Sequence, residues 1–150
     1  MVIAFSTADG IIEDPDGSSG TPSGGWAFRH GPEAVAGDKF NLGPVLETGV
    51  LVLGRTTWQL FSHIWPARAD DFSTAMNRIP KVVASRTMPD LSAWQNSALI
   101  TGDLLETVAE HTTEHDVIVT GSASVVHALA AADLERVSLL GEGVGGSLLG

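Results

Sequence analysis

The chain has 150 residues, enough for one domain with a buried core, and a hydrophobic fraction of 43% favours a folded protein. A net charge of −10, with eight lysines and arginines in total, disfavours binding to nucleic acid or to an anionic membrane surface. The absence of cysteine excludes disulfides, thiolate catalysis and cysteine-bound zinc.

The first part of the chain combines one short strand with a long loop. Residues 2–6 are apolar and predict a strand that ends before Asp9-Gly10. This segment lacks the basic and long apolar stretches of a signal peptide, and no apolar run reaches the ~18 residues of a membrane span. We therefore expect a cytoplasmic protein. Residues 13–25 are rich in Gly, Pro, Asp and Ser, which favour turns, and Trp26 could fix the far end of this loop.

The rest of the chain alternates between predicted helices and strands. The expected helices cover residues 32–47 (broken by glycines), 55–63, 70–78, a segment that Asp103 caps with Glu106 as its partner, and 125–134. The expected strands cover residues 50–53, 81–85, 97–100, 116–120 and 136–140. Several are short aliphatic runs, as burial on both faces requires. The pattern predicts one α/β domain over residues 1–150, with a mostly parallel central sheet and helices on both faces.

Small residues, hydroxyls and two arginines directly follow the predicted strands, at the sheet edge where α/β proteins bind ligands. These positions are Asp9-Gly10, Gly54-Arg55-Thr56, Ser85-Arg86-Thr87, Thr101-Gly102 and Gly121-Ser122-Ala123. Glycine lets a ligand approach the backbone, helix N-termini and hydroxyls bind phosphate oxygens, and arginine binds them bidentately. These residues could instead form ordinary turns and caps. Two arginines in so acidic a chain favour a phosphorylated nucleotide as ligand.

Five motifs, in the same order along the chain, resemble one known family. Val-Leu-Gly-Arg-Thr-Thr-Trp at 52–58 resembles the segment of dihydrofolate reductases that grips the phosphate of NADPH. Ser-x-x-Asp-Gly-x-Ile at 6–12, Ile-Pro-Lys-Val-Val-x-Ser-Arg-Thr at 79–87, Trp-x-Asn-Ser at 94–97 and Gly-Ser-Ala-Ser at 121–124 complete the pattern. They are similar to the dihydrofolate reductase-like family that contains the bacterial riboflavin-biosynthesis (RibD C-terminal) reductase domain.

This resemblance implies a three-layer sandwich and an NADPH-dependent reductase, working as a homodimer, that transfers a hydride to a pteridine or aminopyrimidine-type heterocycle. The implied cofactor-binding residues are Gly54, Arg55 and Thr56 at the 2′-phosphate or pyrophosphate, Ser85 and Arg86 at the adenosine, and Gly121, Ser122, Ala123, Ser124 and Val125 at the pyrophosphate. Asp9 and Gly10 would lie near nicotinamide and substrate, with Asp9 as the catalytic candidate, and Trp26 could line the substrate side. The family continues past its last strand with a loop and one further strand, which we expect to be short or missing here.

Three other interpretations stay open. The segment His111-Thr-Thr-Glu114-His115 matches the inverted zinc-protease motif, but its threonines weaken a helix and a solvated helix end followed by a turn fits better, so we expect no metal. Ser122 resembles a nucleophile elbow, but Ser124 replaces the second glycine of that motif. The third is a catalytically inactive nucleotide-binding module of the same fold.

Overall fold

The computed structural model describes residues 2–6, 9, 11–29, 42, 44–87, 90–133 and 137–141. The chain forms two compact units: unit 1 comprises Met1–Ile3 and Leu42–Ser138, and unit 2 comprises Ala4–Asn41 and Leu139–Gly150. The expectation of one domain over residues 1–150 stays a prediction. So does the expectation about a further strand after residue 141, because those residues lie outside the described part.

Six strands form one sheet in the order β4-β3-β2-β5-β1-β6. They are β1 Val2–Ser6, β2 Val50–Gly54, β3 Lys81–Ala84, β4 Ser97–Leu99, β5 Val117–Val119 and β6 Val137–Gly141. The pairings of β1 with β5, β5 with β2, β2 with β3 and β3 with β4 are all parallel. The predicted strands are confirmed to within one or two residues at each end.

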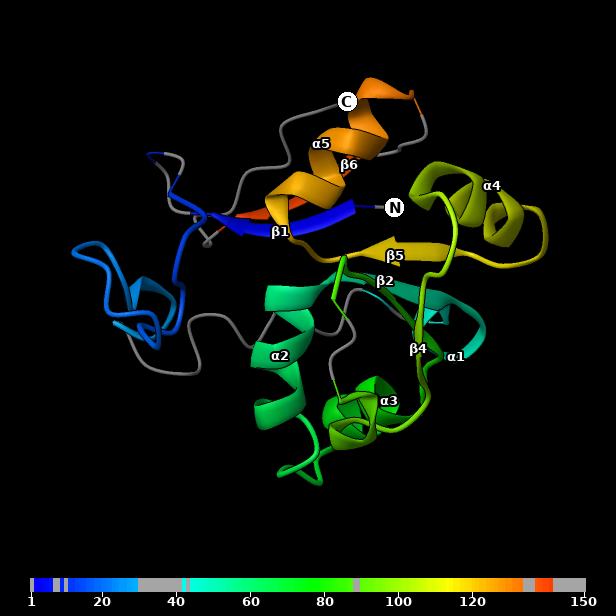
Figure 1. Cartoon of the computed structure of the whole chain (residues 1–150). Coiled ribbons are helices and arrows are strands. Elements are labelled where there is room, and N and C mark those ends of the chain that lie inside the picture. The colour runs from blue at the N-terminus through cyan, green and yellow to red at the C-terminus, as the bar shows by residue number, and fades with distance from the viewer. Residues whose placement is uncertain are drawn as a thin grey trace. The chain divides into compact units, whose positions relative to one another are not determined.

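Five α-helices connect the strands in the described part of the chain. They are α1 Val45–Thr48, α2 Arg55–Ile64, α3 Asp71–Arg78, α4 Leu104–Glu114 and α5 Ala123–Ala131. Figure 1 shows α4 and α5 on one side of the sheet and α2 on the other. This confirms the expected α/β fold with a mostly parallel sheet and helices on both faces. The predicted helix over residues 32–47 falls mainly outside the described residues, and α1 is its described end.

The hydrophobic core explains why β2 is apolar at every position. Val52 packs in a cluster with Val119 of β5, Val108 of α4 and Leu129 of α5. Because successive side chains of a strand point to opposite faces, Leu51 and Leu53 face the α2 side, and all five residues of β2 are buried. Exposed residues therefore begin only after the carboxyl end of β2, at Arg55 and Thr56.

Two helices of unit 1 begin with an aspartate that caps the backbone. The Asp70 carboxylate accepts from the backbone N–H of Ser73 at 3.0 Å and so caps α3. The Asp103 carboxylate accepts from the N–H groups of Leu105 (2.8 Å) and Glu106 (3.1 Å), which confirms the predicted cap of α4. Such caps satisfy N–H groups that a helix leaves without internal partners.

Lys81 is buried at the start of β3, with 1% of its surface exposed. Its Nζ donates to the carbonyl oxygens of Asn77 (3.1 Å), Ile79 (2.7 Å) and Gln95 (3.1 Å), and it lies 4.3 Å from the centroid of the Trp94 ring. Two of these carbonyls belong to the end of α3, where a helix leaves acceptors unpaired. Burial lowers the pKa of Lys81 to about 8. No local sequence pattern around Lys81 indicates that its side chain is buried.

In unit 2, the described residues of the predicted loop form turns around the buried Asp14. Its carboxylate accepts from the backbone N–H groups of Ser19 (2.8 Å) and Thr21 (2.9 Å), and these bonds hold the pKa of Asp14 below its usual value. Trp26 is 4% exposed, and its indole N–H donates to the carbonyl of Glu13 at 3.0 Å. Trp26 therefore fixes the far end of the loop to the loop's own beginning.

Among the residues that the structure describes, no helix has the length and apolar character needed to cross a bilayer.

Candidate nucleotide site

The turns after β2, β3 and β5 meet at one edge of the sheet within unit 1. Gly54 at the end of β2 is in register with Ala84 at the end of β3, and Val52 is in register with Val119 at the end of β5. Because these strands are parallel, their carboxyl ends lie side by side, where α/β sheets bind ligands. A cavity of about 610 Å³ opens there, within the usual range of ligand pockets.

The residues that line this cavity come from four chain segments. They are Arg55, Thr56, Ala84, Ser85, Arg86, Thr87, Ile100, Gly102, Leu104, Ser122, Ser124 and Val125. The structure thus brings together most of the cofactor-binding residues expected from the sequence, from positions up to 70 apart (125 minus 55). The other three, Gly54, Gly121 and Ala123, lie in the same turns. Whether any of them binds a cofactor stays a prediction.

Gly54 allows the turns after β2 and β5 to approach closely. Its N–H donates to the carbonyl of Gly121 at 2.9 Å. A Cβ atom on Gly54 would lie 2.9 Å from the backbone nitrogen and 3.0 Å from the Cβ of Ser122, closer than side-chain carbons normally pack. The φ of Gly54 is −74°, which any residue adopts, so the need for glycine here is steric. At Gly121 the need is conformational, because its φ is +126°.

Two helices begin at the cavity without a side-chain cap. The N-cap of α2 is Gly54, which has no side chain, and the N-cap of α5 is Ser122, whose side chain makes no capping bond. Ser122 Oγ instead lies 3.0 Å from Ser124 Oγ. By contrast, the N-termini of α3 and α4 have their backbone N–H groups bonded to aspartate side chains. Uncapped helix N-termini present backbone N–H groups and a partial positive charge, which suit a phosphate.

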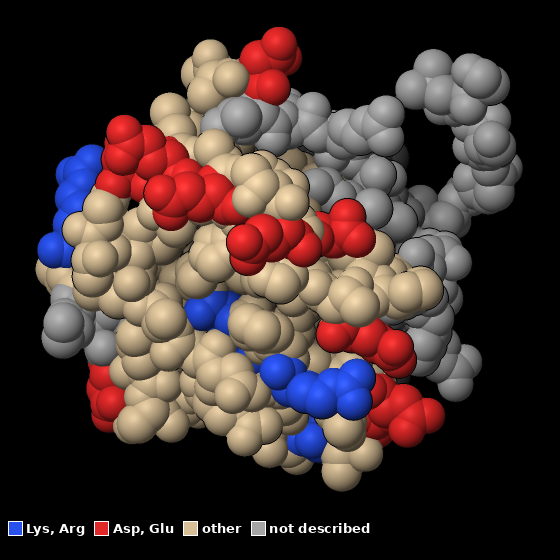
Figure 2. Space-filling model, turned by 90° about the vertical axis from the view of Figure 1, so that its right-hand side faces the viewer, with Lys and Arg blue, Asp and Glu red and all other residues tan. Residues whose placement is uncertain are grey.

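The charges at the cavity add to this preference. Arg55 and Arg86 both line it and are exposed, and no carboxylate is among the described residues that do. The chain as a whole carries a net charge of −10, and Figure 2 shows acidic side chains spread over one face of the molecule. The two arginines therefore give this cavity a positive charge in a chain that is negatively charged as a whole. Ile100, Leu104 and Val125 add an apolar wall. Cations, N–H donors and an apolar wall together suit a phosphorylated ligand that carries a flat ring.

Thr87 is a lining residue that belongs to the expected strand-end positions but is not among the cofactor-binding residues that the resemblance implies. Its Oγ1 accepts from Arg55 Nη1 at 3.0 Å, which joins the turn after β3 to the first residue of α2. The Ser85-Arg86-Thr87 motif marks this turn as part of the site. The sequence does not show that the ends of β2 and β3 are neighbours, and the contact between Arg55 and Thr87 depends on this.

The residues expected on the substrate side belong to unit 2. Asp9 is exposed and lies in the turn after β1. Gly10 lies outside the described residues, and Trp26 is buried against Glu13 as described above. Their expected roles near nicotinamide and substrate stay predictions.

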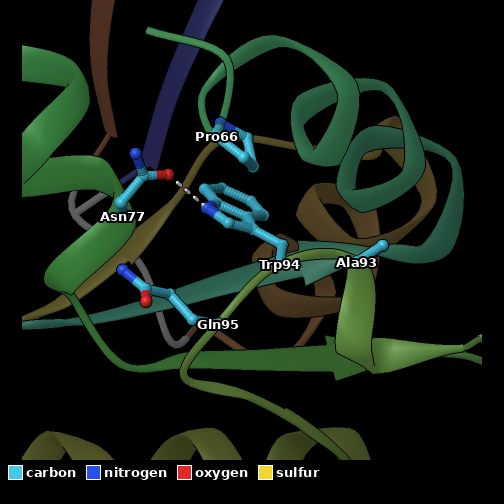
Figure 3. A pocket seen from close by; sticks show the side chains of 5 residues that line it. All are labelled: Pro66, Asn77, Ala93, Trp94 and Gln95. Atoms are coloured by element: carbon cyan, nitrogen blue, oxygen red, sulfur yellow. Dashed lines mark hydrogen bonds between the residues drawn. The ribbon is translucent and has the colours of Figure 1, made fainter. Parts of the chain in front are cut away.

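A second, smaller cavity of about 200 Å³ is lined by Pro66, Asn77, Ala93, Trp94 and Gln95. Figure 3 shows the Asn77 amide and the Trp94 indole pointing toward one another. Trp94 Nε1 donates to Asn77 Oδ1 at 2.8 Å, and Asn77 Nδ2 donates to the carbonyl of Trp65 at 3.0 Å. Both ends of the Asn77 amide are thus hydrogen-bonded within the fold.

The segment His111–His115 ends α4: the helix continues through Glu114 and residues 112–115 are exposed, in agreement with the expected solvated helix end. The helix tolerates both threonines because Thr112 Oγ1 donates to the carbonyl of Ala109 and Thr113 Oγ1 to that of Glu110, each at 2.7 Å. The rings of His111 and His115 lie 6.5 Å apart, centroid to centroid. Within the described residues, no group of three or more potential metal ligands forms around them.

No known protein-family profile matches the sequence, and no curated protein matches it. Solved structures do match. One is a proposed riboflavin biosynthesis protein from Shewanella sp. PV-4, with a TM-score of 0.55 and 17% identity over 89% of this chain and 70% of that one. At this level of identity the likeness shows the fold alone, an α/β fold that this chain shares with that protein.

Proposed function

We propose that the chain is an NADPH-dependent reductase of the dihydrofolate reductase-like kind, which transfers a hydride to a pteridine or aminopyrimidine-type heterocycle. The observation that carries the proposal is the cavity of unit 1, where two uncapped helix N-termini and two arginines meet. The motifs along the chain and the fold likeness to a proposed riboflavin biosynthesis protein favour the same activity.

The residues at the cavity suit a dinucleotide with two separate phosphate groups. Arg55, Arg86 and the hydroxyls of Ser85 and Thr87 lie at the ends of β2 and β3, and guanidinium groups suit a dianionic 2′-phosphate best. The N-terminus of α5 offers backbone N–H groups to the less densely charged pyrophosphate. Ile100 and Leu104 would contact the adenine ring.

The protein's part in the reaction is binding, orientation and delivery of a proton. NADPH, when bound, supplies the hydride, and the acceptor ring then needs one proton to complete its reduction. Asp9, exposed in the turn after β1, is our candidate for the proton donor.

Titration calorimetry with NADPH and NADH tests the cofactor part. We expect Arg55→Ala to weaken NADPH by about tenfold or more and NADH by less than about threefold, because the 2′-phosphate loses a charge-assisted bond. Arg78→Ala is the matched control, since Arg78 is an exposed arginine at the end of α3, outside the cavity lining. Equal losses for both dinucleotides, or equal losses in both variants, would contradict the 2′-phosphate site.

The turnover part is tested by following NADPH absorbance with dihydrofolate and with a ribosylaminopyrimidine as acceptors. We expect oxidation of NADPH with at least one acceptor, and a slower rate in Asp9→Asn with an unchanged affinity for NADPH. Tight NADPH binding without turnover on either acceptor would instead favour an inactive nucleotide-binding module.

A further inference from the structure

The guanidinium of Arg55 is held in place by the turn after β3. Arg55 is the first residue of α2 and is exposed, so its long side chain would otherwise sample many rotamers. Its Nη1 donates to Thr87 Oγ1 at 3.0 Å. This contact spans 32 positions of sequence and crosses from the end of β2 to the end of β3. An arginine restrained before its ligand arrives loses less conformational entropy on binding.

Thr87 is itself restrained by Ser85. The Ser85 hydroxyl donates to the carbonyl of Thr87, and the backbone N–H of Thr87 donates back to Ser85 Oγ at 3.2 Å. Two hydrogen bonds therefore close the turn after β3 and set the place of the Thr87 side chain. Ser85 therefore holds Thr87, and Thr87 holds the Arg55 side chain. All three residues line the same cavity.

The contact with Thr87 leaves the guanidinium able to bind an anion. A guanidinium has five N–H donors, and Thr87 accepts from one of them, so a bidentate pair with a phosphate can still form. The guanidinium can therefore bind the phosphate from the position in which Thr87 holds it. A ligand without that phosphate gains nothing from this restraint.

We propose that Thr87 is a positioning residue that gives the site its preference for 2′-phosphorylated nucleotides, by holding Arg55 at the place where the 2′-phosphate binds. The inference rests on the proposed function of this cavity. It goes further in assigning part of the preference to a hydroxyl on the neighbouring strand end, which makes Arg55 more effective when that hydroxyl is present.

Two probes isolate the 2′-phosphate, namely adenosine 2′,5′-bisphosphate and adenosine 5′-monophosphate, which differ by that group. Titration calorimetry would measure both on wild type, Thr87→Val, which keeps the shape of the side chain, and Thr87→Ser, which keeps the hydroxyl. We expect Thr87→Val to weaken the bisphosphate by about threefold to tenfold and the monophosphate by less than about twofold. Thr87→Ser should stay within about twofold of wild type for both. Thr74→Val, at an exposed threonine of α3 outside the cavity lining, is the matched control and should change neither.

The decisive measurement is Thr87→Val in the Arg55→Ala background. If Thr87 acts through Arg55, the second substitution should then change the affinity for the bisphosphate by less than about twofold. Equal weakening of both probes by Thr87→Val, or a full effect that persists without Arg55, would overturn the inference while leaving the nucleotide site intact. A wild-type protein that binds neither probe nor NADPH would overturn the proposed function, and this inference with it.

Discussion

The close approach at Gly54 gives the sharpest prediction, because Gly54→Ala adds one methyl group where the structure has no room for it. The new Cβ would meet Ser122 N at 2.9 Å and Ser122 Cβ at 3.0 Å, whereas ordinary contacts begin near 3.4 Å. The turns after β2 and β5 must therefore separate by about 0.5 Å, the difference between 3.4 and 2.9 Å. The hydrogen bond from the Gly54 N–H to the Gly121 carbonyl, with a nitrogen-to-oxygen distance of 2.9 Å, would then lengthen beyond the usual range.

The expected cost follows from these distances. Overpacking of this kind costs about 1–3 kcal/mol and a weakened backbone hydrogen bond about 1 kcal/mol. The substitution recovers about 0.4–1 kcal/mol because alanine restricts the unfolded chain, and the φ of −74° suits alanine. The free energy of unfolding should therefore fall by about 1–3 kcal/mol, which lowers Tm by roughly 3–10 °C in a chain of this size. The affinity for NADPH should fall by about tenfold or more, because the turns that line the cavity move apart.

Urea denaturation and NADPH titration on the same protein samples measure both effects. Gly102→Ala is the matched control for stability, since Gly102 lines the same cavity and a Cβ there would have no neighbour within 4 Å. It should unfold at the wild-type free energy, or up to about 0.5 kcal/mol above it. If Gly54→Ala were as stable as Gly102→Ala and bound NADPH like wild type, the turns would not pack as closely as described.

Two further substitutions test the buried charged side chains of Lys81 and Asp14. Lys81→Met removes the ammonium group that donates to three carbonyl oxygens. The free energy of unfolding, measured by urea denaturation, should fall by about 2–4 kcal/mol. A decrease of less than about 0.5 kcal/mol would contradict this expectation. Because the pKa of Lys81 is about 8 when folded against a normal 10.5, the unfolded chain binds more protons between these values. The stability of wild type relative to Lys81→Met should therefore rise from pH 8 to pH 10.5, and a falling difference would refute the argument. Asp14→Asn replaces the carboxylate, which accepts three hydrogen bonds, by an uncharged amide. The backbone N–H groups of Ser19 and Thr21 should then exchange faster with solvent at neutral pH. In wild type, where the pKa of Asp14 lies below 3.8, their protection from exchange should be lost only as the pH falls below 3.8. Equal protection in both proteins at neutral pH would show that the charge is not what orders this loop.

The sequence predicted the elements of unit 1 well, because their signals are local. The apolar run of β2, the glycine that ends it and the start of α2 are adjacent in the chain, and burial on both faces leaves few alternatives for such a run. Asp70 and Asp103 mark helix starts by a bond to a backbone N–H two or three residues away. Where a helix begins and ends is a weaker signal: the last helix is expected over residues 125–134, and α5 spans Ala123–Ala131.

The site was predictable as a set of strand ends, and its internal contacts were not. Parallel strands place their carboxyl ends on one edge, so the turns at 54–56, 85–87 and 121–125 could be assigned to one site without knowing the strand order. The bond between Arg55 and Thr87 depends on β2 and β3 being neighbours, which the order β4-β3-β2-β5-β1-β6 decides. The burial of Lys81 likewise depends on Gln95 and Trp94, which reach it through tertiary packing.

The position of β5 between β2 and β1 sets the earliest moment at which this sheet can form during synthesis. Val2 pairs with Val119, 117 positions later (119 minus 2). At about 5–20 residues per second, a ribosome needs roughly 6–23 s to make the intervening chain. For that time Val2 and Ile3, which are 2% and 3% exposed in the folded protein, lack the strand that covers their edge. A chain shortened before residue 117 would lose the middle of its sheet, and β1 would have no β5 to pair with.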